Sequence, residues 1–497
     1  MNISHGPNSN DTNNQVTLNI VSELCQALAI EKLNYCHWKS NEAISRSACG
    51  DNDLDLLVSR ADAQRFTEIL YRLGFREVQS HQNKRLPGIL SYYGYEPEAN
   101  KLIHVHMHYQ LILGNDLTKN YHIPLEQPYL DSATQTELFR IPAPEFELVI
   151  FVLRMVLKHI TWDSILMRHG SLSPSEHREF DYLATPENLG KAGKVLEKHL
   201  PYIDRPLFDT CLQSLQPHCA LMQRIQTGNK LQKALAACAR KPQTVDIILK
   251  FFRRIWQPFQ WRILRQRPKR RMANGGMLIA IVGGDGAGKT TAVDEISGWL
   301  SKNFEILKLH MGKPAWSWTT VLIRGFLKIG TIIGLYSFDE EPGNGRKLPV
   351  YPRLIRAVCT ARDRYLTYLK GRRFASNGGL AISDRYSISD FLKMDAPQCE
   401  KLAKDFDISN WFLHWLIRIE NAYYQKIMLP DLLIVLRLNP EIAVQRKKGD
   451  EDELFVLPRS TLVWELDWSK MPAHVVDANK PKEEVFSEIK MLLWSHL

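Results

Sequence analysis

The sequence predicts an α/β fold class in two parts: a parallel sheet with flanking helices in the carboxy-terminal half, and an α+β domain with a helical extension in the amino-terminal half. After residue 277, short apolar runs alternate with longer helical patterns, which is the order of strands joined by crossover helices. Between the halves, residues 247–284 contain no acidic residue and include the chain-breaking triplet 274–276. This shift in composition indicates a domain boundary.

Length and charge limit the classes of protein that fit. A chain of 497 residues exceeds what one compact core usually takes, so more than one domain is expected. The formal net charge of +10 favours partners that carry phosphate, namely nucleotides, nucleic acid or an anionic membrane face. The eight cysteines show no paired metal-ligand spacing, so we expect reduced thiols and a cytoplasmic location.

The pattern along the chain divides it into five segments. The polar residues 1–15 lack an apolar core, so they are not a secretory signal and are expected to form a disordered tail. The others are an α+β domain at 16–115, its helical extension at 116–240, a basic helix and linker at 241–276, and the parallel-sheet domain at 277–497.

The periodicity of apolar residues predicts the elements of each half. In the amino-terminal half we expect helices at 17–34 and 61–74, strands at 53–58 and 101–113, and a largely helical stretch at 144–200. In the carboxy-terminal half we expect strands at 277–284, 304–310, 380–384, 431–438 and 475–478, and helices at 289–302, 319–335, 352–371, 406–428, 440–448 and 481–495.

A phosphate-binding loop is the strongest motif in the chain. An apolar strand runs directly into Gly283-x-x-x-x-Gly288-Lys289-Thr290, and a helix follows, which argues against a chance glycine-rich turn. In this arrangement backbone N–H groups and the helix N-terminus surround a phosphate, Lys289 reaches the β- and γ-phosphates, and the Thr290 hydroxyl binds Mg²⁺. The nucleotide-binding residues expected are Gly283, Gly284, Gly286, Ala287, Gly288, Lys289, Thr290 and Thr291.

A second motif supplies the carboxylate that such a loop needs. Asp384 ends the apolar run 380–384, and Arg385 follows it. Asp384 can hold Mg²⁺ directly or through water, and Arg385 can bind phosphate. The alternative is a surface ion pair. It is less favoured because an apolar strand precedes the pair and the chain contains a phosphate loop.

Taken together, these residues resemble thymidylate kinases over about 277–497. The loop matches at Gly283, Asp285, Gly286, Gly288, Lys289, Thr290 and Thr291; further matches are Asp384, Arg385, Tyr386, Ser389, Ala361, Asp363, Arg364, Pro430, Asp431, Pro440, Glu441, Arg446 and the segment 475–478. The resemblance implies a P-loop kinase that uses ATP and Mg²⁺.

The same resemblance assigns roles around the acceptor. Asp285 would meet the sugar of the acceptor nucleotide, and Arg364 and Arg385 would hold its phosphate, with Tyr386 beside them. Arg446 would be a lid cation over the transferred group, although the end of a solvated helix is an alternative. The catalytic residues expected are therefore Lys289, Asp384, Arg385 and Arg446. The long stretch 313–347 and the acidic run 450–453 depart from the family, so the acceptor stays open.

The amino-terminal half carries a pair of carboxylates. Asp53 and Asp55 alternate on a predicted strand, so both point to one face and can hold a divalent metal ion. With Lys39 and Ser40 upstream, the pattern resembles the nucleotidyltransferase superfamily over about 20–240, whose Gly-Ser precedes an Asp-x-Asp strand. Lys39 stands where the family has the glycine. The pattern especially resembles a bacterial branch of the superfamily that has Lys-Gly at this place.

Histidines stand where the family has a third carboxylate. His106 belongs to an alternating run, with His104 and His108 on the same predicted strand. Neutral imidazole binds borderline metals, so these residues are candidate ligands; the alternative is a half-buried strand with satisfied polar side chains. The domain is expected to be either a transferase with an altered site or a nucleotide-binding pseudo-enzyme.

Two further segments bear on partners. Residues 247–271 interleave aromatics with nine cations in a helix broken or kinked at Pro258, which fits an anionic membrane, nucleic acid or an interdomain contact. Residues 316–338 contain Arg324 and Lys328, so an amphipathic helix is expected instead of a transmembrane one. If that helix is exposed, a saccharide or lipid-linked acceptor becomes plausible.

The leading hypothesis is an ATP- and Mg²⁺-dependent phosphotransferase of the thymidylate or nucleoside-monophosphate kinase-like group. Two alternatives stay open: nucleotidyl transfer by the amino-terminal domain, and a nucleotide-switched scaffold on a membrane or partner. The expected partners are a nucleotide and an acceptor phosphate, saccharide or lipid-linked group. Peripheral contact with the inner membrane face and a dimer are both compatible with the sequence.

Overall fold

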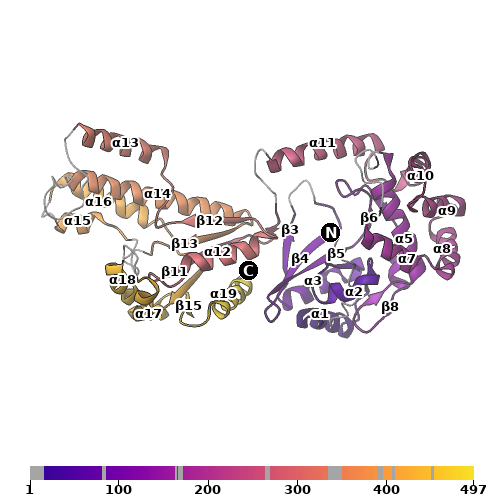
Figure 1. The fold of residues 1–497 in the computed structure, drawn as a ribbon, viewed down its shortest axis with the longest axis horizontal. Coiled ribbons are helices and arrows are strands. Elements are labelled where there is room, and N and C mark those ends of the chain that lie inside the picture. Colours follow the sequence, from indigo (N-terminus) through magenta and orange to yellow (C-terminus); the bar gives the residue numbers. More distant parts are fainter. Residues whose placement is uncertain are drawn as a thin grey trace, which may run out of the picture. The chain divides into compact units, whose positions relative to one another are not determined.

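The chain forms two compact units, Met1–Pro268 and Lys269–Leu497, called here the N-terminal and C-terminal units. Figure 1 shows their ribbons. This computed structural model describes residues 16–80, 85–162, 165, 172–262, 269–333, 350–388, 396–405, 409–448 and 453–497. The expected tail at 1–15, most of the acidic run 450–453 and Ser389 of the second kinase motif lie outside the described residues.

A mixed sheet forms the first part of the N-terminal unit. Its strands follow the order β1, β2, β5, β4 and β3. They are β1 Tyr35–His37, β2 Leu54–Val58, β3 Arg76–Gln79, β4 Ile89–Glu96 and β5 Lys101–His108. β2 runs parallel to β5, and the other pairs are antiparallel.

Strand β2 divides its side chains between the two faces of this sheet. Leu54, Leu56 and Val58 join a buried cluster with the helices α1 (Asn19–Ile30) and α3 (Ala63–Arg72). Leu57 belongs instead to the cluster of the helical extension. Because side chains alternate along a strand, Asp55 lies on the same face as Leu57, toward the extension.

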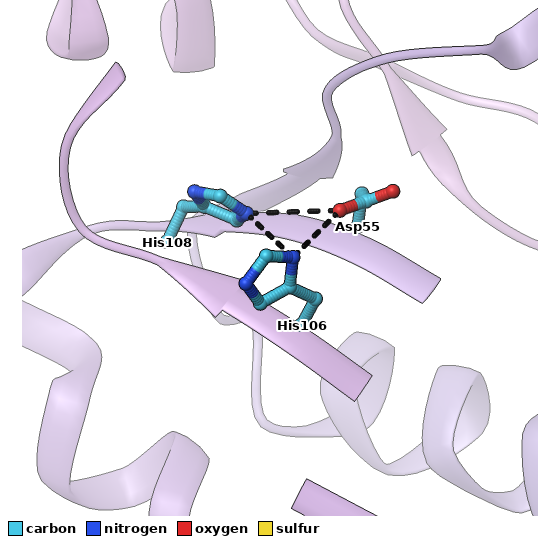
Figure 2. A group of neighbouring side chains, drawn as sticks. All are labelled: Asp55, His106 and His108. Carbon is cyan, nitrogen blue, oxygen red and sulfur yellow. Dashed lines mark hydrogen bonds and ion pairs between the residues drawn. The ribbon is translucent and has the colours of Figure 1, made fainter. Parts of the chain in front are cut away.

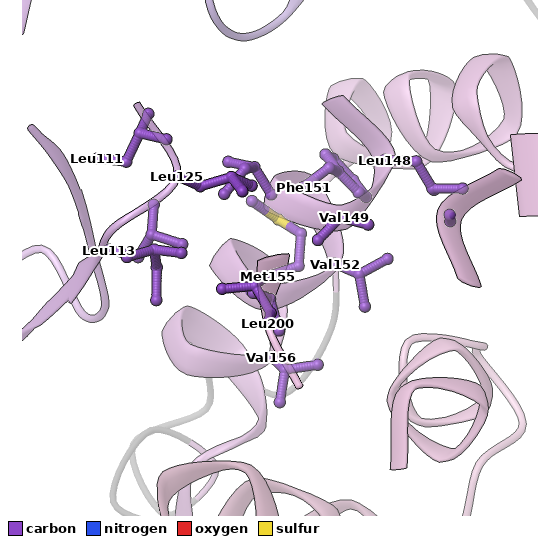
Figure 3. Close-up of a cluster of buried hydrophobic side chains, with 14 of the residues drawn as sticks. Leu111, Leu113, Leu125, Leu148, Val149, Phe151, Val152, Met155, Val156 and Leu200 are labelled. Carbon is purple, nitrogen blue, oxygen red and sulfur yellow. The ribbon is translucent and has the colours of Figure 1, made fainter. Parts of the chain in front are cut away.

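The helical extension is built around one buried helix. The extension contains β6 Leu111–Leu113, β7 Tyr121–Ile123, α4 Glu126–Asp131, β8 Thr134–Gln135, β9 Arg140–Ile141, α5 Pro144–Met155, the π-helical turn Val156–Ile160, α7 Pro174–Leu183, α8 Pro186–His199, α9 Arg205–Ser214 and α10 Leu221–Ala234. In α5, Leu148, Val149, Phe151 and Val152 are all buried (Figure 3). From Leu148 to Leu153 this helix is apolar on all sides, and such a segment must lie inside the core.

The expected basic helix is α11, Gln243–Arg262. It continues through Pro258, so the predicted break does not occur; a single proline removes one backbone hydrogen bond, and the helix tolerates that loss here. Near its start, Asp246 and Lys250 form a buried ion pair, with Nζ of Lys250 2.7 Å from Oδ2 of Asp246. Ile248, Phe252 and Ile255 are exposed. The helix therefore buries one ion pair inside the unit and exposes a strip of apolar side chains to solvent.

A parallel sheet forms the centre of the C-terminal unit, in the order β12, β13, β11, β14 and β15. The strands are β11 Met277–Gly283, β12 Ile306–His310, β13 Leu380–Asp384, β14 Leu432–Arg437 and β15 Ala473–Asp477. All seven residues of the middle strand β11 are buried, as expected for a strand covered on both faces. The predicted α/β class with a parallel sheet is confirmed.

Helices flank this sheet. They are α12 Lys289–Ser301, α13 Trp318–Ile332, α14 Val350–Ser376, α15 Cys399–Asp405, α16 Trp411–Tyr424, α17 Pro440–Arg446, α18 Glu453–Glu465 and α19 Lys482–His496. Leu278 and Ala280 of β11 pack with Tyr368 of α14, and Trp299 of α12 meets Trp494 of α19 edge to face. The sequence patterns missed α15, which has seven residues, and α18, which contains Pro458.

Helix α13 presents an exposed apolar surface. Trp318, Phe326 and Ile329 are more than half exposed, and Arg324 and Lys328 lie on the same helix. Within the described part of the chain, no helix has both the length and the apolar content needed to cross a bilayer.

The buried helix α5 supports a stability prediction. Phe151 is 1% exposed and lies against Phe180 of α7, with ring centroids 6.1 Å apart. We expect Phe151→Ala to lower the free energy of unfolding of the N-terminal unit by about 3–5 kcal/mol because it leaves a cavity in a packed core. Denaturant titration of the full chain measures this. Tyr182→Ala, at a half-exposed position on α7, is the control, with an expected change within about 0.5 kcal/mol; equal losses would contradict the packing described.

Candidate functional site

The predicted phosphate loop connects the end of β11 at Gly283 to the start of α12 at Lys289. Gly288 has a φ of +85°, a left-handed conformation that favours glycine. A Cβ added to Gly284 would lie 2.9 Å from Cα of Ser460, so this position has no room for a side chain. Glycine is therefore needed at both positions. The turn leads directly into the N-terminus of α12, as the sequence predicts.

Lys289 folds back over this loop. It is 8% exposed, and its Nζ donates a hydrogen bond to the carbonyl oxygen of Gly284 at 2.7 Å. Its Nζ also lies 3.8 Å from Oδ1 of Asp285. The ammonium group is thus held directly above the turn that would surround a phosphate.

Thr290 and Asp384 meet at the edge of the loop. The parallel pairing of β11 with β13 places Asp384 opposite Ile281. The Thr290 hydroxyl donates to Oδ2 of Asp384 at 2.9 Å. The other carboxylate oxygen, Oδ1, is buried and accepts no hydrogen bond from the described residues. A hydroxyl and a carboxylate with a spare buried oxygen are the hard ligands that Mg²⁺ prefers, so the pair fits this ion.

Cations converge on Asp285 of the loop. Nη1 of Arg459 lies 3.0 Å from Oδ2, and Nη2 of Arg385 lies 3.7 Å from Oδ1. Arg385 has a φ of +70°, which is unusual for a residue with a side chain and often occurs at functional sites. Arg459 belongs to α18, and sequence reasoning missed it because it stands in no motif and the helix itself was not expected.

Arg446 lines a cavity on the other side of the loop. Its Nη2 lies 3.3 Å from the carbonyl oxygen of Ala478 and its Nη1 lies 3.5 Å from that of Gly286. The cavity has a volume of about 320 Å³. It is lined by Gly286, Ala287, Gly288, Thr291, Ala292, Leu436, Arg446, Ala478, Lys480, Lys482, Val485 and Phe486. No motif pointed to Lys480, Lys482 or Phe486.

The other two predicted acceptor residues are held in the interior. The buried Arg364 donates from Nε to the carbonyl oxygen of Met311 at 3.0 Å and from Nη1 to the hydroxyl of Tyr424. Tyr386 is 1% exposed, and its hydroxyl donates to the carbonyl oxygen of Met428 at 2.6 Å. Of the four predicted acceptor residues, Asp285 and Arg385 therefore meet each other at the loop, while Arg364 and Tyr386 bond to backbone and to Tyr424.

A second group of polar side chains lies in the N-terminal unit, where β2 and β5 run side by side with Asp55 opposite His106. Oδ1 of Asp55 lies 3.2 Å from Nδ1 of His106 and 3.6 Å from Nε2 of His108. The two imidazole nitrogens are 3.3 Å apart, and all three side chains point toward one another (Figure 2). Nζ of Lys39 also lies 2.8 Å from Oδ1 of Asp55.

Asp53 does not join this group. It precedes β2, and its Oδ1 lies 2.9 Å from Nδ1 of His104. The two predicted carboxylates thus pair with different histidines. Burial would raise the pKa of Asp55, but the charge of Lys39 and hydrogen bonds from His106 and His108 hold this pKa well below its usual value. Burial lowers the pKa of His108 to about 3.

Ser40 faces carboxylates of the helical extension. Its backbone, in a left-handed conformation with φ of +59°, donates N–H to Oε1 of Glu179 at 3.0 Å. The next N–H, of Asn41, donates to Oε1 of Glu147 at 3.3 Å. Arg154 pairs with Glu179 at 2.8 Å. Backbone N–H groups that could bind a phosphate therefore already bind protein carboxylates.

Comparison with known proteins supports a thymidylate kinase-like part of the chain. No family model matches the sequence. A probable thymidylate kinase of Picrophilus torridus is 26% identical over 173 residues, which are 35% of this chain and 67% of that protein. A probable thymidylate kinase of Staphylothermus marinus is 24% identical over 233 residues, which are 45% of this chain and 98% of that protein. These similarities support a nucleotide kinase-like function at the level of the family.

The buried Glu147, which accepts a hydrogen bond from the N–H of Asn41, gives a pH prediction. Burial raises its pKa from 4.5 to about 7. The protonated form therefore stabilises the fold fully below about pH 4.5, and this contribution is lost as the pH rises through about 7. We expect Glu147→Gln to raise the free energy of unfolding by about 3 kcal/mol at pH 8 and to change it little at pH 4.5.

Denaturant titration at the two pH values measures this difference. Glu145→Gln, at a half-buried carboxylate in the first turn of the same helix, is the matched control and should give no gain that depends on pH. An equal effect of Glu147→Gln at both pH values would contradict the raised pKa of the Glu147 carboxyl.

Proposed function

We propose that the C-terminal unit is an ATP- and Mg²⁺-dependent phosphotransferase of the thymidylate or nucleoside-monophosphate kinase-like group. The observation that carries this proposal is the contact of Thr290 with Asp384 beside the glycine-rich turn. It joins a phosphate-binding loop to two hard oxygen ligands, and Oδ1 of Asp384 accepts no hydrogen bond from the residues that the structure describes. The similarity to two probable thymidylate kinases supports the same class of reaction.

The loop residues bind and orient the phosphates of ATP. The N–H groups between Gly283 and Lys289 surround the phosphate, and the N-terminus of α12 adds its positive end. Lys289 exchanges its hydrogen bond to Gly284 for one to a phosphate oxygen. Thr290 and Asp384 would hold Mg²⁺, which supplies neutralisation of charge on the transferred phosphoryl group.

The cations around the loop oppose the charge that develops during transfer. Arg385 and Arg459 already approach Asp285 from two elements, so an incoming phosphate would enter a cluster of positive charge. Arg446 lines the cavity of about 320 Å³, which we assign to the nucleoside part of ATP together with Lys480 and Phe486. Lys289, Asp384 and Arg385 are therefore proposed as the catalytic residues, and Arg446, predicted as a lid cation, is proposed to bind the nucleotide from the cavity.

The acceptor site is proposed on the side of Asp285 and Arg385. Asp285 would bind the sugar of the acceptor, and Arg385 its phosphate. Arg364 and Tyr386 would shape this side from beneath, because their polar atoms bond to Met311, Tyr424 and Met428. The exposed apolar surface of α13 leaves a saccharide or lipid-linked acceptor open beside a nucleoside monophosphate.

The two alternative functions have weaker support. For nucleotidyl transfer, the N–H groups of Ser40 and Asn41 are occupied by Glu179 and Glu147, and Asp55 has histidine neighbours in place of further carboxylates. For a membrane scaffold, the exposed apolar strip of α11 fits an anionic membrane, but this placement is equally compatible with a kinase at the inner membrane face. We therefore retain membrane contact as a proposal about location only.

The Lys289→Ala variant tests the proposed reaction. We expect phosphoryl transfer from γ-labelled ATP to fall by at least about 100-fold, because a preorganised cation at the phosphate is lost, while the melting temperature changes little. Lys302→Ala, at the exposed C-terminal end of the same helix, is the control and should keep full turnover.

The acceptors in this assay are dTMP, the other nucleoside monophosphates and sugar phosphates. We expect label on a nucleoside monophosphate with the wild type and with Lys302→Ala. Unchanged turnover in Lys289→Ala would overturn the kinase assignment, and transfer only to a sugar phosphate would exclude a nucleoside monophosphate in favour of the saccharide acceptor.

A further inference from the structure

No single arrangement of protons makes all three contacts among Asp55, His106 and His108, called here the Asp-His-His group, attractive. Three ligand atoms, one from each residue, lie within 4.8 Å of one another, at separations of 3.2, 3.3 and 3.6 Å. A proton on Nδ1 of His106 can serve its contacts with both neighbours, but it leaves the Asp55 oxygen facing a bare nitrogen of His108. A proton on His108 instead leaves Asp55 facing a bare nitrogen of His106, and protons on both make the two nitrogens repel.

A single cation between the three atoms satisfies all of these contacts at once. Around a tetrahedral ion with bonds of about 2.0–2.1 Å, the ligand atoms lie about 3.3–3.4 Å apart. The separations of 3.2, 3.3 and 3.6 Å lie on either side of this value. The spacing in the Asp-His-His group is therefore that of three ligands of one ion, and among the His, Cys, Asp and Glu side chains that the structure describes, these three make up the group.

The environment favours a bound ion as well. The carboxylate and the imidazole of His108 are held by neighbouring parallel strands and by Trp38, whose ring meets that of His108 edge to face at 5.0 Å. His106 is 30% exposed on its side chain, so the group opens to solvent on one side. Rigid strands preorganise the ligands, and the open side gives an ion its path of entry.

Lys39 supplies a positive charge to this group. Its Nζ lies 2.8 Å from the same Asp55 oxygen that faces both histidines. Its side chain is 24% exposed, and its ammonium also lies 5.1 Å from the centre of the Trp38 ring. Lys39 can therefore move off Asp55 toward solvent when another cation arrives, and the two cations compete for one carboxylate.

The ligand set selects the class of metal. Two imidazole nitrogens and one carboxylate oxygen suit zinc and similar transition-metal ions, whereas Mg²⁺ and Ca²⁺ prefer oxygen ligands alone. We propose that the Asp-His-His group binds one divalent ion of the zinc class, with three protein ligands and an open fourth position for water or a substrate. Such an open position is the arrangement of reactive zinc sites, in contrast to closed structural ones. This site is independent of the kinase site proposed for the C-terminal unit.

Cobalt(II) is the spectroscopic probe that tests this proposal. The full chain is titrated with Co²⁺ in the presence of excess Mg²⁺, and the visible absorption of a tetrahedral ion with nitrogen and oxygen ligands is followed. We expect one such ion per wild-type chain, displaced by Zn²⁺, and without the charge-transfer band that a cysteine thiolate gives. His106→Gln, at the exposed ligand, should weaken binding by at least about tenfold. His122→Gln, at another half-buried histidine of the same unit, is the matched control and should bind as the wild type does.

Lys39→Met separates a metal site from a cluster of hydrogen bonds. If Lys39 competes for Asp55, its removal should tighten Co²⁺ binding by about tenfold, whereas a loss of structure would weaken it. Thermal unfolding of each variant checks that the N-terminal unit is intact. Absence of the tetrahedral spectrum from the wild type, or equal binding by the wild type and His106→Gln, would overturn the proposal. Neither result would bear on phosphoryl transfer, because the Lys289 assay reads a different unit.

Discussion

The hydrogen bond from Thr290 to Asp384 joins the first turn of α12 to the end of β13, and the candidate kinase site depends on it. The bond exists because β11 and β13 pair in parallel, with Ile281 opposite Asp384. A shift of one residue in this register would place every side chain of the shifted strand on the other face of the sheet, so the packing on the two faces fixes the position of the carboxylate. Oδ1 of Asp384 is buried and has no hydrogen-bond partner in the described part of the chain, which costs about 1–3 kcal/mol, and a bound cation would remove this cost.

The two units use adjacent parallel strands in different ways. In the C-terminal unit, β11 ends at the glycine-rich loop, and the cations Arg385 and Arg459 lie beside Asp285 of this loop. In the N-terminal unit, β2 and β5 bring Asp55 and His106 together, while the helical extension sends Glu179 to the N–H of Ser40. The cations beside the loop of the C-terminal unit attract anions. In the N-terminal unit a protein carboxylate already accepts the N–H of Ser40, and Asp55 with His106 offers ligands for a cation. A phosphate reaction is thus supported in one unit and a metal site in the other.

Local chemistry made part of this structure predictable. The strand, loop and helix around 283–290 and the carboxylate at Asp384 follow from residue types with strict local requirements, and strong periodicity marks most of the helices. Contacts between distant residues were not predictable. Glu179 reaches Ser40 across 139 positions, and Arg459 reaches Asp285 across 174. Alternation alone placed Asp53 with Asp55, but Asp53 precedes the strand and pairs with His104.

If Asp384 and the loop together bind ATP with Mg²⁺, calorimetric titration with ATP will show it. We expect Mg²⁺ to tighten ATP binding by at least about tenfold in the wild type, because the ion links the phosphates to Thr290 and Asp384. In Asp384→Asn this gain should disappear, while binding of ATP without Mg²⁺ stays close to that of the wild type. An equal gain from Mg²⁺ in both proteins would contradict the account.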